Sequence, residues 1–387
     1  MRLFLPTQHD DIHAKVVARA LEQKGHDVVL WYDTDLPQRA TVSMSLAQDG
    51  TYDIELRGPE GPLDGPFDRV WWRRPTTAVL PEAMHAADLE FANQEWRWLL
   101  WGLRHCLAPQ AFWVNPLEAA LRAEHKALQL AIATQVGLDV PPTLISSDPA
   151  RIRSFLGSHS GQTIYKAFRT SAWALEDGAA VSYTATVDED NLPPNAVLSW
   201  VPGIYQPRIE KRHELRVTII GRQLFVVQID SQAHASSQVD WRAGVEGHTL
   251  TPARLEPSLE RRCLALMDRL GLVFGCLDFM VTPDGRTVFL EVNQSGQFLW
   301  LEEQCPSLPV LDAFCRLLEE GTGLITARRP ELRFSDFHDP ALDRTIDEAH
   351  VRGDHGEAYS DHDDGVSEHE SQHLAGNGPS PTRRDHP

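Results

Sequence analysis

Two short segments near residue 280 constrain this chain most, because each embeds an acidic residue in an apolar run typical of a strand. The segments are Leu277-Asp278-Phe279-Met280 and Leu290-Glu291-Val292-Asn293, separated by the turn sequence Pro283-Asp284-Gly285. Side chains alternate between the two faces of a strand, so Asp278 points away from Leu277 and Phe279. Glu291 and Asn293 are two residues apart and share a face. If the turn pairs the strands, three oxygen-bearing side chains converge on one face of a hairpin.

An all-oxygen cluster of this kind suits Mg²⁺, which proteins usually hold with one or two carboxylates plus substrate phosphates. The alternative is an acidic strand face that is simply exposed to water. Because apolar residues surround each acidic position, we favour a metal site at Asp278, Glu291 and Asn293.

Two lysines and two arginines upstream extend this pattern. Lys126 lies in a helix expected over residues 117–136, and Lys166 ends an apolar strand-like run. Beside a metal cluster, a lysine on a strand is most simply a point-charge ligand for phosphate, although each lysine taken alone fits a surface position better. Arg216, at the mouth of a hairpin strand, and Arg242 are candidates to neutralise charge that develops during phosphoryl or acyl transfer.

Several familiar catalytic motifs are missing from the sequence. It contains no Walker A motif, no G-x-G-x-x-G and no G-x-S-x-G, which disfavours P-loop, Rossmann and α/β-hydrolase sites. The five cysteines form no C-x-x-C pair, so free buried thiols are expected rather than disulfides or a zinc knuckle.

Length and charge narrow the functional class further. The 387 residues allow two or three domains, and 36 basic against 55 acidic residues give a net charge of −19. This acidic balance disfavours nucleic acid as a partner, since phosphate-backbone binding depends on Lys and Arg. No signal-like N-terminus and no long apolar window are visible, so we expect a soluble cytoplasmic protein without a membrane partner.

The pattern of elements predicts an α/β (α+β) chain that opens with a β-α-β unit and a hairpin around Asp49-Gly50. Six of the eleven tryptophans fall between residues 71 and 113, and we favour an aromatic core there over a peptide-binding surface. Residues 336–387 contain 13 acidic and 4 basic residues with few apolar ones, which predicts a disordered acidic tail. Its histidines lack regular ligand spacing, so metal binding there is not expected.

The order of these features resembles the ATP-grasp superfamily, and more closely the ATP-grasp ribosomal peptide maturases, the microviridin-type or graspetide ligases. The resemblance covers about residues 1–325 and rests on the following segments: Val70-Trp71-Trp72-Arg73-Arg74-Pro75, His125-Lys126-Ala127-Leu128-Gln129-Leu130, Gly137 to Thr143, Glu214-Leu215-Arg216-Val217, Leu277-Asp278-Phe279, Phe289 to Gln297, and Trp300-Leu301-Glu302.

The resemblance implies an ATP-grasp fold with a pre-ATP-grasp domain at residues 1–114 and an ATP-grasp domain at 115–330, whose small lobe spans about 140–205. It implies that Lys126 and Lys166 hold ATP phosphates and that Glu214 binds the ribose. The adenine would meet the backbone of a hinge formed by Gln206, Pro207, Arg208 and Ile209. Asp278, Glu291 and Asn293 would coordinate Mg²⁺, and Arg216 with Arg242 would steady the acyl phosphate. A glycine-rich loop common in the superfamily is absent after Lys166, where Thr170 and Ser171 are the alternative contacts.

The resembled family activates Asp or Glu side chains of a precursor peptide with ATP and closes macrocyclic esters or amides, often as a dimer. A leader-peptide site is expected at the acidic run Asp188, Glu189, Asp190 and Asn191, whose simpler interpretation is a solvated turn. Two alternatives stay open: a carboxylate-amine ligase acting on a small molecule or a protein C-terminus, and a catalytically silent leader-binding scaffold.

Overall fold

The computed structural model describes residues 1–63, 65–159, 162–169, 172–175, 178–181, 184–232 and 249–337. Three sets of sequence predictions lie outside these residues. They concern Arg242, the loop residues Thr170 and Ser171, and residues 338–387 of the expected tail.

The chain opens with the expected β-α-β unit, which forms part of a parallel sheet. Strands β1 (Arg2–Thr7) and β2 (Asp27–Tyr32) flank helix α1 (Ile12–Gln23), and β6 (Arg69–Trp71) and β7 (Phe112–Val114) complete the order β2-β1-β6-β7. Asp11 fixes the start of α1, because its carboxylate accepts hydrogen bonds from the backbone N–H groups of His13 and Ala14. The predicted hairpin is also present, as β3 (Thr41–Leu46) and β4 (Tyr52–Gly58), with β5 (Gly61–Leu63) added at its edge.

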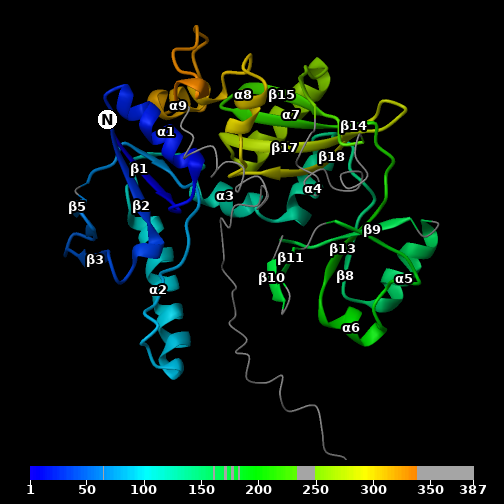
Figure 1. Cartoon of the computed structure of the whole chain (residues 1–387), viewed down its shortest axis with the longest axis horizontal. Helices are drawn as coiled ribbons and strands as arrows, with labels where there is room; N and C mark the ends of the chain where they lie inside the picture. The colour runs from blue at the N-terminus through cyan, green and yellow to red at the C-terminus, as the bar shows by residue number, and fades with distance from the viewer. Residues whose placement is uncertain are drawn as a thin grey trace, which may run out of the picture.

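Helix α2 (Ala86–Cys106) corrects the expectation of an aromatic core in part. Trp71 and Trp72 are buried as expected, but Trp98 on α2 is 70% exposed. Of the 21 residues of α2, only Leu100, Leu103 and Arg104 are buried. The helix therefore projects away from the rest of the described chain, as Figure 1 shows.

The single helix expected over residues 117–136 is wrong. The chain forms α3 (Leu117–Ala123) and α4 (Lys126–Gln135), with an extended residue, His125, between them. No proline or glycine marks this break. Its cause is tertiary, because the Gln129 side chain donates to the Ala123 carbonyl, which would accept a backbone bond in a continuous helix. The break makes Lys126 the first residue of α4.

A small antiparallel sheet follows, with the order β12-β9-β13-β8. Its strands are β8 (Leu144–Ser146), β9 (Thr163–Lys166), β12 (Ala185–Val187) and β13 (Gly203–Pro207). Helices α5 (Pro149–Ser158) and α6 (Asn195–Trp200) pack on the face that carries Tyr165 and Tyr205. Strand β11 (Gly178–Val181) does not join this sheet, because it pairs with β10 (Ala172–Leu175) in a separate hairpin.

The large antiparallel sheet has the order β16-β15-β14-β17-β18. Its strands are β14 (His213–Ile220), β15 (Gln223–Ile229), β16 (Leu250–Pro252), β17 (Phe274–Val281) and β18 (Thr287–Asn293). Helix α7 (Pro257–Leu270) and α4 pack on the face that carries Leu215 and Val217. In Figure 1 this sheet lies above the small sheet and beside the N-terminal unit.

Helices α8 (Leu299–Gln304) and α9 (Val310–Glu320) join the large sheet to the N-terminal unit. Trp71 of β6 packs on Phe314 of α9 with ring centroids 4.5 Å apart, and Phe314 contacts Phe274 of β17 at 5.0 Å. One continuous apolar core therefore spans α1, α9 and one end of β17. No helix in the described ranges is long and apolar enough to cross a membrane.

The boundary predicted for the disordered tail, residue 336, is two residues too early. A short 3₁₀ turn, η4 (Phe334–Phe337), ends the described chain, and Phe334 is buried in the same core. Phe337 packs against that core, and the Asp336 carboxylate accepts from the Arg333 N–H. These two residues belong to the folded part because a pair of phenylalanines supplies apolar surface that the rest of the segment lacks.

Candidate active site

A row of charged side chains crosses the large sheet. Arg216 on β14 lies directly opposite Asp278 on β17, which lies directly opposite Glu291 on β18. Directly opposed residues in antiparallel strands project from the same face, so the three side chains point to one side. The convergence predicted from the sequence is therefore present.

Arg216 and Asp278 form a buried ion pair at the centre of this row. Arg216 is fully buried and Asp278 is 7% exposed. The Arg216 Nη1 lies 3.0 and 3.1 Å from the two carboxylate oxygens, while its Nη2 donates to the Gln297 carbonyl at 3.0 Å. Asn293 also joins the cluster, because its Nδ2 donates to Asp278 Oδ2 at 3.3 Å. Arg216 is thus held in place by Asp278 on one side and by the Gln297 carbonyl on the other.

Lys126 reaches this row from α4. Its Nζ lies 3.1 Å from the Glu291 Oε2, and both side chains keep a minor exposed fraction. The helix break at His125 makes this contact possible, because it starts α4 at Lys126 beside β18. The structure thereby unites two groups, the lysine and the carboxylate, that lie far apart in the sequence.

Gln129 fixes the distance between α4 and β18. Its Nε2 donates to the Val292 carbonyl at 2.9 Å, and its Oε1 accepts from the Val292 N–H at 2.9 Å. Strand β18 is the last strand of the large sheet, so these bonds satisfy its outer edge between Glu291 and Asn293. The sequence analysis did not single out Gln129, and only its position three residues after Lys126 offered a signal.

Asn115 braces the two strands of the site from the other end and was also missed. Its Nδ2 donates to the carbonyls of Phe274 and Gln294, and its Oδ1 accepts from the N–H groups of Val273 and Phe274, at 2.8 to 2.9 Å. The residue is 2% exposed. A buried asparagine with four hydrogen bonds ties the start of β17 to the residue after β18, which keeps the carboxylates in register.

The small sheet presents a second set of polar groups. Lys166 lies opposite Ile204, and Gln206 lies opposite Ile164, so these four residues share the face turned away from α5 and α6. Gln206 is 3% exposed and donates through Nε2 to the Thr143 hydroxyl at 3.0 Å. Its Oε1 is buried and accepts no hydrogen bond within the described residues. A buried amide oxygen of this kind is suited to a ligand N–H donor.

The remaining residues of the predicted hinge lie at the end of β13 and directly after it. Pro207 ends the strand, and the Arg208 N–H donates to the Gln162 carbonyl at 2.8 Å, so the segment from Arg208 to Ile209 leaves the small sheet beside β9. Glu214, two residues before Arg216, shares the face of the charged row. Its carboxylate accepts from Lys211 Nζ at 2.5 Å, and both residues are buried.

Glu124 is a further acidic group that the sequence analysis did not predict. It lies in the break between α3 and α4, and its Oε1 accepts from Gln294 Nε2 at 2.9 Å. Desolvation by the surrounding protein raises its pKa, and the charge of Glu291 adds to the rise, while Gln294, Arg169 and Lys126 oppose it. The Glu124 carboxyl group therefore lies within electrostatic range of Glu291 and Lys126.

The acidic run predicted for leader binding divides into two pairs. Asp188 and Asn191 close a tight turn: the Asp188 Oδ1 accepts from the N–H groups of Asp190 and Asn191 at 3.0 Å, and the Asn191 Oδ1 accepts from the Asp188 N–H at 2.9 Å. Glu189 is exposed and lies 2.5 Å from Arg153 Nη1 of α5. The turn interpretation therefore accounts for Asp188 and Asn191, whereas Glu189 is paired with Arg153 and Asp190 is exposed.

The donor set fits a hard cation. Asp278, Glu291 and Asn293 offer carboxylate and amide oxygens, which are the atoms that Mg²⁺ prefers. No group of three or more His, Cys, Asp or Glu side chains with metal-binding geometry occurs within the described ranges. Two carboxylates and one amide are a set that fits a cation bound jointly with a phosphate ligand.

Three solved structures show how far this architecture is shared. A RiPP-associated ATP-grasp ligase from Chryseobacterium gregarium, in complex with ADP and a leader and core peptide, is 25% identical with a TM-score of 0.76, covering 86% of this chain and 99% of that one. Macrocyclase MdnC from Microcystis aeruginosa MRC, bound with precursor peptide MdnA, is 28% identical with a TM-score of 0.73, covering 83% and 100%. ATP-grasp ligase PsnB, complexed with a precursor variant, Mg and ADP, is 20% identical with a TM-score of 0.60, covering 82% and 98%.

No protein-family model and no curated protein sequence matches the chain. The solved structures, however, match over almost their whole length, so the likeness includes the N-terminal unit as well as both sheets of the site. The polar rows described above occupy the two sheets of this shared fold. The chain therefore has the ATP-grasp fold and is similar to RiPP-associated ATP-grasp ligases over almost the whole length of those proteins.

Proposed function

We propose that the protein uses ATP to activate Asp or Glu side chains of a ribosomally made precursor peptide and closes macrocyclic ester or amide links. The observation that carries this proposal is the row from Arg216 through Asp278 to Glu291 and Lys126, set in a fold shared over full length with peptide-bound ATP-grasp ligases. ATP as co-substrate supports a cytoplasmic site for the reaction.

In this proposal the nucleotide lies between the two sheets. Lys166 and Lys126 hold its phosphates, and the segment from Gln206 to Ile209 meets the adenine. The orphaned Oε1 of Gln206 supports this arrangement, because an exocyclic amino group would satisfy it. Glu214 serves the ribose, and it would release Lys211 or share that contact.

Asp278, Glu291 and Asn293 would hold Mg²⁺, which would supply charge neutralisation and alignment of the phosphates. Lys126 pairs with Glu291, and Arg216 pairs with Asp278. Joint binding of a cation and a polyanion would keep these charges neutralised. The cation would pair with Glu291, and Lys126 would pair with a phosphate.

The reaction balances without an enzyme nucleophile. A peptide carboxylate attacks the γ-phosphorus of ATP, and ADP leaves. A hydroxyl or amine of the same peptide then attacks the acyl carbon, the new ester or amide bond forms, and phosphate leaves with the acyl oxygen. Arg216, held by Asp278 and the Gln297 carbonyl, would stabilise the negative charge of the acyl phosphate. Catalysis would depend on positioning and on exclusion of water.

The leader segment of the precursor would bind the small lobe. Glu189 and Asp190 are exposed at the turn after β12, and the end of α6 nearby exposes Trp200 and the following residue Val201, at 74% and 60%. A basic residue beside aromatic residues would match these two features. Such a peptide would replace Arg153 as the partner of Glu189.

The test combines the purified chain, ATP, Mg²⁺ and a precursor peptide in which a leader is followed by Thr, Ser or Lys and by Asp or Glu residues. We expect a product lighter by one water per ring, with one ADP and one phosphate released for each. Asp278→Asn should lower the rate by ~10²–10³, corresponding to about 3–4 kcal/mol of lost transition-state stabilisation. Because Asp278 partners a buried arginine, the less buried Glu291→Gln is the parallel variant, and melting curves establish that both fold.

Asp268→Asn is the matched control. Asp268 of α7 also forms an Arg–Asp pair, with Arg222 of the β14–β15 turn at 2.9 Å, but both partners are exposed. The Asp268→Asn variant should turn over the precursor at the wild-type rate. Near-normal turnover of Asp278→Asn with both substrates saturating would contradict the site. ATP-dependent ligation of free amino acids with no change in the precursor would point to the small-molecule ligase instead.

A further inference from the structure

Strand β2 is an open edge of the N-terminal parallel sheet. It pairs with β1 on one side, and within the described parts of the chain no strand pairs with its other side. Its six residues offer an edge of about 20 Å at ~3.3 Å per residue. Proteins usually cover or blunt such an edge, because its unpaired N–H and C=O groups invite another strand.

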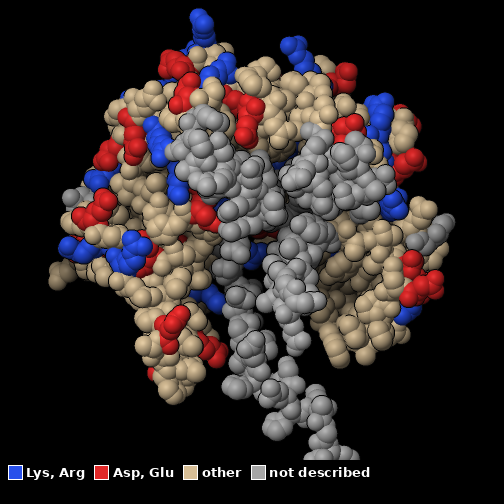
Figure 2. Space-filling view, viewed as in Figure 1, with Lys and Arg blue, Asp and Glu red and all other residues tan. Residues whose placement is uncertain are grey.

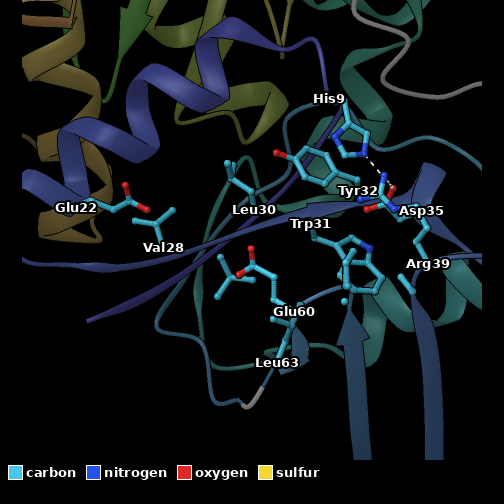
Figure 3. A pocket seen from close by; sticks show the side chains of 14 residues that line it. His9, Glu22, Val28, Leu30, Trp31, Tyr32, Asp35, Arg39, Glu60 and Leu63 are labelled. Carbon is cyan, nitrogen blue, oxygen red and sulfur yellow. Dashed lines mark hydrogen bonds and ion pairs between the residues drawn. The ribbon is translucent and has the colours of Figure 1, made fainter.

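A pocket of about 520 Å³ runs along this edge. Five consecutive β2 residues, from Val28 to Tyr32, line it, and Glu60 of the β4–β5 turn with Leu63 at the end of β5 lies on the opposite side. Figure 3 shows Glu22 and Val28 at one end, and Asp35 and Arg39 at the other. The strand edge is therefore the floor of a groove with a wall on each side.

The walls of this groove favour a peptide of a particular chemistry. Val28, Leu30 and Leu63 supply apolar contacts for alternate side chains. Asp35 is already engaged, by His9 at 2.9 Å and by Arg39 at 3.5 Å. Glu22 and Glu60, by contrast, are exposed and form no ion pair with any described residue. The groove thus carries a surplus of negative charge along an unpaired backbone.

We propose that this groove binds an extended peptide segment with basic side chains, which adds to β2 as a fifth strand of the sheet. Backbone hydrogen bonds to β2 provide the affinity, and Glu22 and Glu60 select for lysine or arginine. The groove is built from the N-terminal unit alone, so this binding is separate from the nucleotide site between the two other sheets.

The test uses a fluorescein-labelled heptapeptide of alternating valine and lysine as the probe, with the full chain. Two further versions carry N-methyl groups on the odd or on the even residues. In a strand, one set of amides faces β2 and the other faces away. We expect only one of the two methylated probes to lose binding, and we expect the amides of Val28–Tyr32 to exchange hydrogen more slowly when the unmodified probe is bound.

The charge requirement is tested with Glu22→Gln combined with Glu60→Gln. This double variant should weaken the valine–lysine probe about tenfold, since each exposed ion pair is worth up to about 1 kcal/mol. Asp53→Asn, on the same hairpin but outside the pocket, is the control and should leave binding unchanged. The rate of ATP-dependent turnover of the precursor should be equal in all variants.

Three results would overturn the proposal. One is equal affinity for both N-methylated probes, which would exclude strand pairing. Another is a glutamate-substituted probe that binds as tightly as the lysine probe. The third is protection from exchange that falls outside β2, since the probe would then occupy a different surface.

Discussion

Replacement of Gln129 by methionine tests whether the link between α4 and β18 holds the site together. Methionine keeps the length and helix propensity of glutamine but removes its three hydrogen bonds to backbone. Those bonds go to the Ala123 carbonyl and to both backbone groups of Val292, which lies between the proposed cation ligands Glu291 and Asn293. Gln129 is 4% exposed, so water cannot replace them without reorganisation of the site.

The expected magnitude follows from these contacts. A buried group left without its hydrogen bond costs about 1–3 kcal/mol, and the lower end applies because carbonyls tolerate the loss better than N–H groups. Three groups give about 3 kcal/mol. For a domain of ~200 residues this corresponds to a fall of roughly 6–12 °C in melting temperature. Loss of a contact that orients cation ligands also weakens metal binding, typically by ~10–100-fold.

Two assays measure the two effects. Thermal melting without ligand gives the stability change, and calorimetric titration of ADP at varied Mg²⁺ gives the cation dependence of nucleotide binding. Gln135→Met is the control, because Gln135 lies on the same helix but is exposed, and among the described residues its side chain bonds only Arg269, at 2.7 Å. We expect it to change stability by less than about 0.5 kcal/mol.

The reasoning fails if Gln129→Met melts within about 1 °C of the wild type, since the bonds would then contribute little. It also fails if stability falls while the Mg²⁺ dependence of ADP binding is unchanged. In that case Gln129 would stabilise the fold without positioning the carboxylates.

Three further predictions concern other parts of the chain. Truncation after Phe337 should leave the melting temperature unchanged, whereas truncation after Arg333 should lower it by several degrees, because it removes the buried Phe334; equal melting curves would contradict this. Glu189→Ala with Asp190→Ala should weaken binding of a labelled leader peptide about tenfold and spare ADP, while equal loss of both ligands would indicate damage to the fold. Burial alone would raise the pKa of Asp11, but Arg73 and Arg74 hold it well below its usual range, so its ion pairs stabilise the fold above about pH 4 and are lost as the pH falls further. The stability difference between wild type and Asp11→Asn, measured by denaturant unfolding, should therefore be constant near neutral pH and shrink in acid.

Surface charge on the described part of the chain is mixed, as the interspersed acidic and basic residues in Figure 2 show. The net charge of −19 therefore does not translate into one uniformly acidic face on this side. Electrostatic attraction of a partner depends on local groups such as Glu189 or Glu60, because exposed charges interact only over about one Debye length.

The sequence by itself determined the elements whose signal is local. Alternation in strands placed Asp278, Glu291 and Asn293 on one face, because the side-chain period of a strand is two wherever it pairs. The turn sequence between β17 and β18 then set their pairing closely enough to predict the cluster. The segments around Asp278 and Glu291, together with those around Lys126 and Glu214, were sufficient to indicate the ATP-grasp fold.

Only the tertiary structure decided which polar groups meet. The break before Lys126, the bonds of Gln129 and Asn115 to strands more than 150 residues away, and the approach of Glu124 to Gln294 have no local signature. Each depends on a backbone group or edge strand left unsatisfied until distant elements pack against it. A side chain that completes such bonds looks in the sequence like any other polar residue on a helix or loop, because its partner exists only in the folded chain.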